Sequence, residues 1–176
     1  LEDAELEEFI GMIKGDVADT SAFIASLKEA LASKKATAEG QMFTDFTIVQ
    51  DPDNAETSTV KFSDYVGNGK YVLVDFWASW CGPCKREIPN IAAVYDKYKG
   101  DDFDVLSVAV WDKPEDTKKA AAEHGVVWNQ IINAQKIPTD IYGIEGIPHI
   151  MLVGPDGTIV KRDLRGENIE KAVAEA

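Results

Sequence analysis

The sequence predicts an α/β fold with a central mixed β-sheet flanked by helices and an N-terminal helical extension. Apolar runs at residues 71–77 and 105–111 indicate two buried strands. A helical pattern follows each run, which implies parallel neighbours joined by a right-handed crossover. Residues 149–153 and 158–164 flank the turn sequence Gly-Pro-Asp-Gly, a strong hairpin signal that adds antiparallel strands.

The first forty residues differ from the rest because they predict two helices without a strand between them. Apolar residues recur at helical spacing over residues 6–13 and 23–31. Side chains suited to an N-cap precede each of these two patterns. Such a pair either packs on the main domain or is the tail of a preceding domain. We divide the chain into a helical extension, residues 1–40, and one main domain, residues 41–176.

The main domain is expected to begin with a hairpin, because residues 42–49 and 59–62 alternate weakly around turn residues. The strand at residues 71–77 is apolar almost throughout, as in a central strand covered on both faces. A helix should follow the cysteines and end near Gly100.

A second helix is expected to open at Pro114 and to stop near Gly125, after the strand at residues 105–111. A less regular stretch then leads to the C-terminal hairpin. Residues 168–174 predict a short helix that closes the chain.

The chain is acidic, because 18 Lys and Arg against 31 Asp and Glu give a net charge of −13 over 176 residues. Such a charge repels phosphate backbones and anionic lipid surfaces, so we expect neither nucleic acid nor lipid as a partner. We expect the basic pairs at residues 34–35, 118–119 and 161–162 to be solvated surface without a function. The pair at residues 85–86 either adds positive potential beside a thiolate or is a solvated helix face.

The two cysteines of the chain, Cys81 and Cys84, stand two residues apart where the first main-domain helix is predicted to begin. One helical turn brings them to the same face, so their sulfurs can close a disulfide or open as a dithiol. The N–H groups at the helix start favour the thiolate of Cys81, the form that attacks another sulfur. The leading hypothesis is therefore thiol-disulfide exchange.

Three other roles compete for the pair. A zinc site needs four ligands, but His124 and His149 lie far along the chain and there is no second cysteine pair. Covalent haem attachment needs histidine directly after the second cysteine, where Lys85 stands. An inert structural disulfide remains an alternative. Two points weigh against it: closing so short a loop removes little chain entropy, and Gly82-Pro83 at a helix start predicts an exposed, electropositive site.

Longer strings around the cysteines resemble the thioredoxin superfamily. These are Val-Asp-Phe-Trp-Ala-Ser-Trp-Cys-Gly-Pro-Cys-Lys at residues 74–85, Pro89, and Gly-Ile-Pro at residues 146–148. Further strings are similar to the TlpA/ResA branch of bacterial cell-envelope thiol-disulfide oxidoreductases, at residues 43–46, 85–89, 147–148 and 154–160. The resemblance covers about residues 40–176 and leaves the helical extension unexplained.

The resemblance implies a thioredoxin-like fold, no cofactor, and a cis peptide bond at Pro148 beside the cysteines. In such folds this proline is held to keep metal from the dithiol, and the residue before it presents backbone groups to an incoming peptide. The residues expected to contact a partner are Trp80, Gly82, Pro83, Ile147 and Pro148.

The resemblance also implies partners that carry disulfides or thiols, an upstream thiol donor, and a location in the bacterial cell envelope or periplasm. The chain begins at Leu1 rather than methionine and shows no signal-peptide pattern. We therefore interpret it as a processed or trimmed product whose targeting segment lies outside the sequence.

Reduced Cys81 is expected to attack a partner disulfide, forming a mixed disulfide that Cys84 resolves. Cys84 must lose a proton on the way, which requires a nearby carboxylate of raised pKa. Asp75 lies in an apolar strand and matches the buried acid of thioredoxin. Glu87 lies one helical turn past Cys84 and either matches an acid of the envelope branch or is a solvated surface residue. His149 either approaches the sulfurs or is an ordinary strand histidine.

A Gly-Pro pair between the cysteines is typical of thioredoxin, whose couple lies at about −270 mV, against about −120 mV for strongly oxidising relatives. We therefore favour a reductant. A thioredoxin-like module that holds partner proteins or passes on a metal, with little redox turnover, is the alternative from another class. A peroxide-reducing enzyme is a third reading, although its attacking cysteine usually stands without a C-x-x-C partner.

Overall fold

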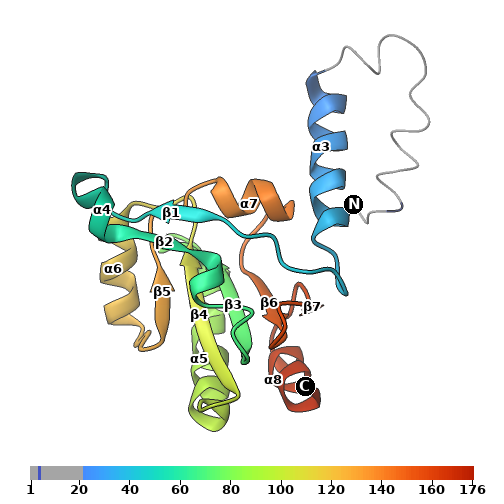
Figure 1. Ribbon diagram of the computed structural model, residues 1–176. Coiled ribbons are helices and arrows are strands. Elements are labelled where there is room, and N and C mark those ends of the chain that lie inside the picture. Colours follow the sequence, from blue (N-terminus) through green and yellow to red (C-terminus); the bar gives the residue numbers. More distant parts are fainter. Residues whose placement is uncertain (1–3, 5–21) are drawn as a thin grey trace.

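The computed structural model describes Ala4 and residues 22–176 of the chain. Within these residues, five strands form a mixed sheet in the order β5-β4-β3-β6-β7, and β1 pairs with β2 in a separate ribbon (Figure 1). The predicted fold class is confirmed.

The strands are β1 (Thr47–Val49), β2 (Thr59–Lys61), β3 (Tyr71–Trp77), β4 (Phe103–Ala109), β5 (Asn129–Ile131), β6 (His149–Val153) and β7 (Ile159–Lys161). The helices are α3 (Ala22–Ala36), α4 (Ala55–Ser58), α5 (Gly82–Tyr98), α6 (Pro114–Glu123), α7 (Ile137–Tyr142) and α8 (Glu167–Glu175). Short 3-10 turns lie at Pro52–Asn54 and Phe62–Asp64.

Strand β3 is the centre of the sheet because it is hydrogen-bonded on both sides. It pairs in parallel with β4, where Asp75 faces Ser107, and antiparallel with β6, where Asp75 faces Ile150. Every residue of β3 after Tyr71 is buried. The structure thus confirms the prediction of a central strand at residues 71–77 that is covered on both faces.

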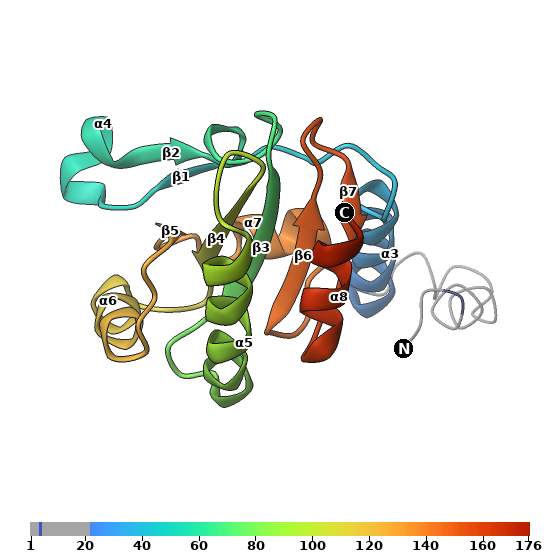
Figure 2. The ribbon, with the colours of Figure 1, turned by 90° about the horizontal axis from the view of Figure 1, so that it is seen from below.

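Each face of the sheet carries its own apolar core. Helices α5 and α8 lie on one face (Figure 2), where their apolar side chains pack with Leu73 and Leu152. On the other face, Tyr142 of α7 and Ile48 of β1 pack with Val74. Because side chains alternate along a strand, β3 contributes to both cores and holds the two layers together.

Several elements differ from the sequence-based expectation, among them β1, which spans Thr47–Val49 rather than residues 42–49. Strand β4 ends at Ala109 rather than at residue 111, because Trp111 has a φ of 53°, outside the strand region. Strand β7 spans only Ile159–Lys161. The stretch expected to be irregular contains β5 and α7, whose three and six residues are too few to establish a periodic pattern.

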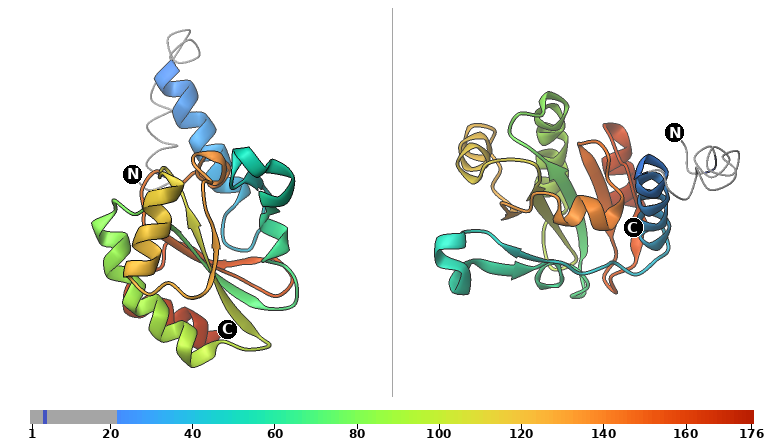
Figure 3. Two further views of the ribbon diagram at one scale, coloured as in Figure 1. Left: turned by 90° about the vertical axis from the view of Figure 1, so that its left-hand side faces the viewer. Right: turned by 90° about the horizontal axis from the view of Figure 1, so that it is seen from above.

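Helix α3 confirms the second of the two predicted N-terminal helices, and it packs on the main domain beside α7 (Figure 3). Ile24 and Leu31 are buried, whereas Phe23 is 63% exposed. The first predicted helix, at residues 6–13, lies outside the described residues. None of the helices in the described part of the chain is long and apolar enough to cross a membrane.

The close approach of α3 to α7 depends on Gly143, which ends α7 with a φ of 63°. A Cβ atom at this position would lie 2.6 Å from Cγ of Lys34 and 3.0 Å from the carbonyl oxygen of Ala30. Glycine alone tolerates both the backbone angle and the contact. This packing places α3 next to the loop that leads into β6.

Candidate functional site

Cys81 and Cys84 form a disulfide where the segment after β3 leads into α5. Their Cα atoms lie 5.2 Å apart. Cys81 is the N-cap residue of α5, and its Sγ accepts a hydrogen bond from the Cys84 N–H at 3.2 Å. When the disulfide is open, this N–H and the positive end of the helix dipole favour negative charge on the Cys81 sulfur.

The cysteines are more buried than the exposed site that the sequence predicted. Cys81 keeps 4% of its surface exposed and Cys84 1%, because both join the core that packs under α5. Around them, Pro83 is exposed and Trp80 is 59% exposed. Both cysteines are thus buried in the oxidised protein, Cys84 slightly more than Cys81.

The loop before β6 lies against the disulfide. The peptide bond between Ile147 and Pro148 is cis, as the thioredoxin resemblance implied. The carbonyl oxygen of Ile147 lies 3.6 Å from Cys81 Sγ, so a reduced Cys81 thiol has an acceptor at this point. The structure thus brings Ile147 and Pro148 to the cysteines from 66 residues away in sequence.

Asp112, which the sequence analysis did not single out, anchors the loop that leads into the disulfide. Its carboxylate accepts hydrogen bonds from the Ser79 N–H at 2.9 Å, the Ser79 hydroxyl at 2.8 Å and the Thr117 hydroxyl at 2.7 Å. The Trp80 indole donates to the Trp111 carbonyl at 2.9 Å. The available signal was an acidic residue just past the carboxyl end of a parallel strand, where α/β sheets gather functional groups.

Asp75 is a buried carboxyl group on the face of β3 that packs against α5. Strand alternation places it on the same side as Leu73 and Trp77, which share one core with both cysteines. Asp75 is 1% exposed. Burial, followed by the negative charge of Glu87, raises its pKa to about 8, although the Ser107 hydroxyl opposes this shift.

Two polar atoms on this face of β3 are buried without a hydrogen-bond partner among the described residues. They are Oδ1 of Asp75 and Nε1 of Trp77. Leaving such groups unpaired costs free energy. A buried acid with a strongly raised pKa is typical of functional sites, because natural proteins seldom retain this cost elsewhere.

Glu87 is half-buried and holds a neighbouring helix in place. Its two carboxylate oxygens accept from the Gly166 N–H at 3.2 Å each, and Oε2 accepts from the Asn90 side chain at 2.9 Å. Gly166 is the N-cap residue of α8. Glu87 is therefore not a freely solvated glutamate, and its charge acts on Asp75.

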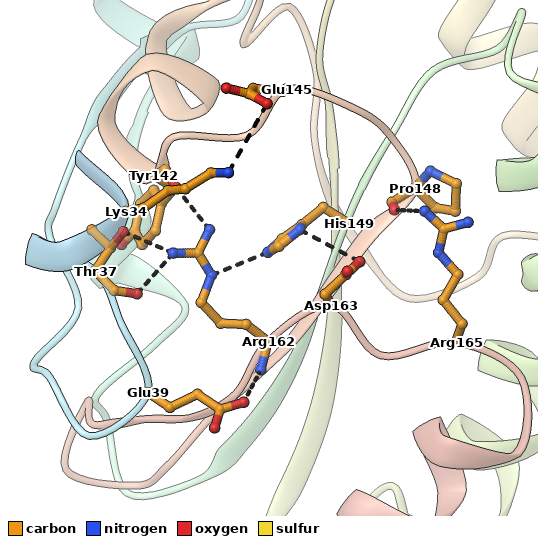
Figure 4. Close-up of polar contacts among 10 residues, drawn as sticks. All are labelled: Lys34, Thr37, Glu39, Tyr142, Glu145, Pro148, His149, Arg162, Asp163 and Arg165. Carbon is orange, nitrogen blue, oxygen red and sulfur yellow. Dashed lines mark hydrogen bonds and ion pairs between the residues drawn. The ribbon is translucent and has the colours of Figure 1, made fainter. Parts of the chain in front are cut away.

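His149 lies in a polar network beside Pro148 (Figure 4). Its Nε2 accepts from Nε of Arg162 at 3.2 Å, and its Nδ1 lies 3.9 Å from Oδ1 of Asp163. Burial, followed by the charge of Arg162, lowers the pKa of His149 to about 4, so the ring is neutral at pH 7. These contacts favour the interpretation of His149 as a strand histidine.

Arg162 corrects the expectation that the basic pair at residues 161–162 is plain solvated surface. Its guanidinium donates to the Thr37 carbonyl and hydroxyl at 2.9 Å each and to the Tyr142 carbonyl at 2.7 Å (Figure 4). It therefore joins the end of α3 to α7 and β7. The sequence could not show this, because Thr37 lies 125 residues away from Arg162.

The pair at residues 85–86 lies at the start of α5 with the cysteines. Nη1 of Arg86 would lie 3.5 Å from a Cβ atom at Gly82, so this cation folds back over the first turn of the helix. That position favours the first of the two alternatives for this pair, in which it contributes positive potential beside a thiolate. Among the described residues, no group of three or more His, Cys, Asp or Glu side chains is placed to hold a metal ion.

Comparison with known proteins places this arrangement in a family. A model of the AhpC/TSA family matches residues 39–162. The chain belongs to this family. Thiol-disulfide oxidoreductase ResA of Geobacillus thermodenitrificans (strain NG80-2) is 30% identical to it over 128 residues, which are 73% of this chain and 70% of the relative.

Two solved structures of similar proteins have the same fold. The thioredoxin domain of a thiol-disulfide oxidoreductase from Bacteroides vulgatus is 34% identical, with a TM-score of 0.67 over 78% of this chain and 96% of that chain. A thiol:disulfide interchange protein from Bacteroides sp. is 35% identical, with a TM-score of 0.66 over 80% and 90%. The fold is thioredoxin-like, and the protein is a thiol-disulfide oxidoreductase of this family.

The buried Asp75 predicts an unusual dependence of stability on pH. Its pKa is about 8 in the folded protein against an ordinary value of 3.8. The fold therefore keeps its full contribution from this group below about pH 4 and loses it as the pH rises through about 8. We expect Asp75→Asn to remove this loss, which amounts to at most about 1.4 kcal/mol per pH unit for one proton.

Urea unfolding of the oxidised protein from about pH 5 to pH 9 measures this effect, because disulfide-bonded cysteines do not titrate. The free energy of unfolding of Asp75→Asn should rise relative to wild type across this range. The control Glu87→Gln should retain the loss but shift it to lower pH, since the Glu87 charge helps to raise the pKa of Asp75. Parallel curves for wild type and Asp75→Asn would contradict the assignment.

Proposed function

We propose that the protein reduces disulfide bonds in partner polypeptides, with Cys81 as the attacking thiolate and Cys84 as the resolving thiol. The observation that carries this proposal is the position of Cys81 at the start of α5, with its sulfur accepting from the Cys84 N–H at 3.2 Å. The helix start stabilises a thiolate, and the second thiol lies within bonding distance of the first.

In the first step, the Cys81 thiolate attacks one sulfur of the partner disulfide and releases the other as a thiolate. In the second step, the Cys84 thiolate attacks Cys81 Sγ and releases the remaining partner thiol. The partner disulfide gains two electrons and two protons, and the Cys81–Cys84 dithiol becomes a disulfide. An upstream thiol donor returns it to the dithiol.

Asp75 is proposed to accept the proton that Cys84 loses before the second step. Cys84 is 1% exposed, so bulk water has little access to it, while Asp75 lies on the same buried face. A carboxyl pKa of about 8 is close to that of a thiol, about 8.5, which suits proton transfer between the two. Glu87 is proposed to act through Asp75 by raising its pKa.

A partner chain is proposed to bind at the exposed side of the disulfide. Trp80 and Pro83 offer exposed surface there, and Gly82 leaves the backbone open between them. Ile147 and Pro148 close the opposite side, with the Ile147 carbonyl 3.6 Å from the sulfur of Cys81. The oxidoreductase domain is proposed to comprise residues 41–176, with the helical extension added to it.

The reducing direction and the location rest on the thioredoxin-type sequence of the site. Gly-Pro stands between the cysteines, as in thioredoxin, whose reduction potential of about −270 mV makes it a reductant. The resemblance to envelope relatives supports a place in the bacterial cell envelope or periplasm.

The order of attack predicts which variant traps partners. Cys84→Ser should accumulate mixed disulfides through Cys81, because it lacks the thiol that resolves them. Wild type should catalyse the reduction of insulin by dithiothreitol, and Cys84→Ser should not. Cys81→Ser is the matched control and should trap far less, since Cys84 is almost fully buried. Absence of both trapping and insulin reduction would favour a thioredoxin-like binding module instead.

The two acids are expected to differ in their effect on the rate. Asp75→Asn should slow resolution of the mixed disulfide by about tenfold or more, because it removes the proton acceptor. Glu87→Gln should slow it less, because the glutamine oxygen still accepts from Gly166 and only the charge is lost. Stopped-flow Trp fluorescence can measure both rates, and equal rates for wild type and Asp75→Asn would contradict the proton-acceptor role.

The direction of electron flow is measurable as a reduction potential. Equilibration with glutathione or dithiothreitol buffers should give a value near that of thioredoxin, roughly −270 mV. A potential more oxidising than about −200 mV, in the range of protein disulfide isomerase or above, would overturn the reductant role. It would leave thiol-disulfide exchange itself intact.

A further inference from the structure

A hollow of about 390 Å³ opens beside the disulfide, between α3, the loop before β6 and the segment after β7. Ile147 lines this hollow, and its carbonyl oxygen lies 3.6 Å from Cys81 Sγ. Ile147 therefore lies between the hollow and the reacting sulfur. The exchange reaction at the two cysteines needs no part of this hollow.

The lining of the hollow carries excess positive charge. Lys34, Arg162 and Arg165 contribute three cations, and Glu145 and Asp163 contribute two carboxylates, so the sum is one positive charge. The neighbouring His149 ring is neutral at pH 7. In a chain with a net charge of −13, a cationic site this close to the reacting sulfur stands out.

The three cations differ in what they already bind. Arg162 holds α3, α7 and His149 together through several hydrogen bonds (Figure 4). Lys34 lies 4.0 Å from a carboxylate oxygen of Glu145. Arg165 is exposed and, among the described residues, its side chain donates one hydrogen bond, from Nη2 to the Pro148 carbonyl at 2.9 Å.

That single bond fixes the Arg165 guanidinium beside Pro148 and leaves its other N–H groups for a ligand. Guanidinium N–H groups in a fork match the two oxygens of a carboxylate. The position next to Pro148 places them at the edge where a bound partner chain passes. Arg165 is therefore the group of the hollow best placed to bind an anion.

The cations that can reach a ligand come from outside the family-matched region. The AhpC/TSA model matches residues 39–162, whereas Lys34 lies in α3 and Arg165 lies beyond β7. The α3 wall of the hollow thus belongs to the helical extension, whereas Arg165 belongs to the main domain, residues 41–176. An added wall beside a shared reaction centre is suited to partner selection rather than to the chemistry.

We propose that this hollow is a specificity subsite that binds a carboxylate side chain of the partner polypeptide, close in sequence to the cysteine that Cys81 attacks. The proposal rests on the reductase function proposed above. Arg165 binds the carboxylate through hydrogen bonds, and Lys34 adds charge. An extended chain advances about 3.3 Å per residue, so the acidic residue lies roughly one to three positions from the cysteine.

Synthetic peptides test the subsite directly. Each peptide has one cysteine joined by a disulfide to a chromophoric aryl thiol, and carries Glu or Gln at one of the three positions on either side. The reduced protein attacks the peptide sulfur and releases the coloured thiolate. For wild type, we expect the second-order rate constant of thiolate release from the best Glu peptide to exceed that from its Gln counterpart by about fivefold at low salt. The ratio should decrease as salt screens the charge.

The variants Arg165→Gln and Lys34→Gln, separately and together, should bring this Glu-to-Gln ratio towards one, with the larger loss for Arg165→Gln. Lys119→Gln is the matched control, because it removes the same charge from α6, at the other end of the sheet (Figure 2). It should keep the wild-type ratio. Circular dichroism establishes that each variant is folded.

The outcomes separate the two proposals. Thiolate release from both peptides at equal rates at every position overturns the subsite and leaves the reductase function standing. A wild-type preference for Glu that survives the Arg165→Gln, Lys34→Gln double variant also overturns it. No release from any peptide overturns the reductase function, and the subsite with it.

Discussion

The pairing of β3 with β4 on one side and β6 on the other is the constraint on which the site depends. The parallel pair with β4 brings Asp112 to the loop that precedes Cys81, where it binds Ser79. The antiparallel pair with β6 brings Ile147 to the sulfur of Cys81. Because β3 is buried on both faces, neither neighbour can shift without breaking a core, and the reacting sulfur keeps its position.

The same strand carries a buried carboxyl group whose charged form is costly in the folded protein. Asp75 stands in the middle of an otherwise apolar strand, with one carboxyl oxygen unpartnered among the described residues. The fold accepts this acid in its neutral form, and burial is the main reason for its raised pKa. A carboxylate whose charge is costly in the folded protein is well suited to take up the proton that a neighbouring thiol loses.

The helical extension is joined to the rest of the chain through side chains and through a backbone hydrogen bond to β7, from the Gly40 N–H to the Ile159 carbonyl at 2.8 Å. Arg162 of the segment after β7 binds Thr37 at the end of α3, and Gly143 lets the backbone of α3 approach α7. Since Arg162 also binds His149, the contact between the extension and the domain lies one residue from Pro148. An element added at the N-terminus thereby becomes a neighbour of the reaction centre.

The dithiol chemistry, strand β3 and the helix that follows it were predictable from the sequence, because a C-x-x-C pair, an apolar run and a helical period are local signals. Burial of an acid at Asp75 also followed from its apolar neighbours. The burial of Cys81, the hydrogen bonds of Asp112 and the contacts of Arg162 became visible only in the folded chain. These facts depend on contacts between residues 33 to 125 positions apart, and no local pattern records which distant segments pack together.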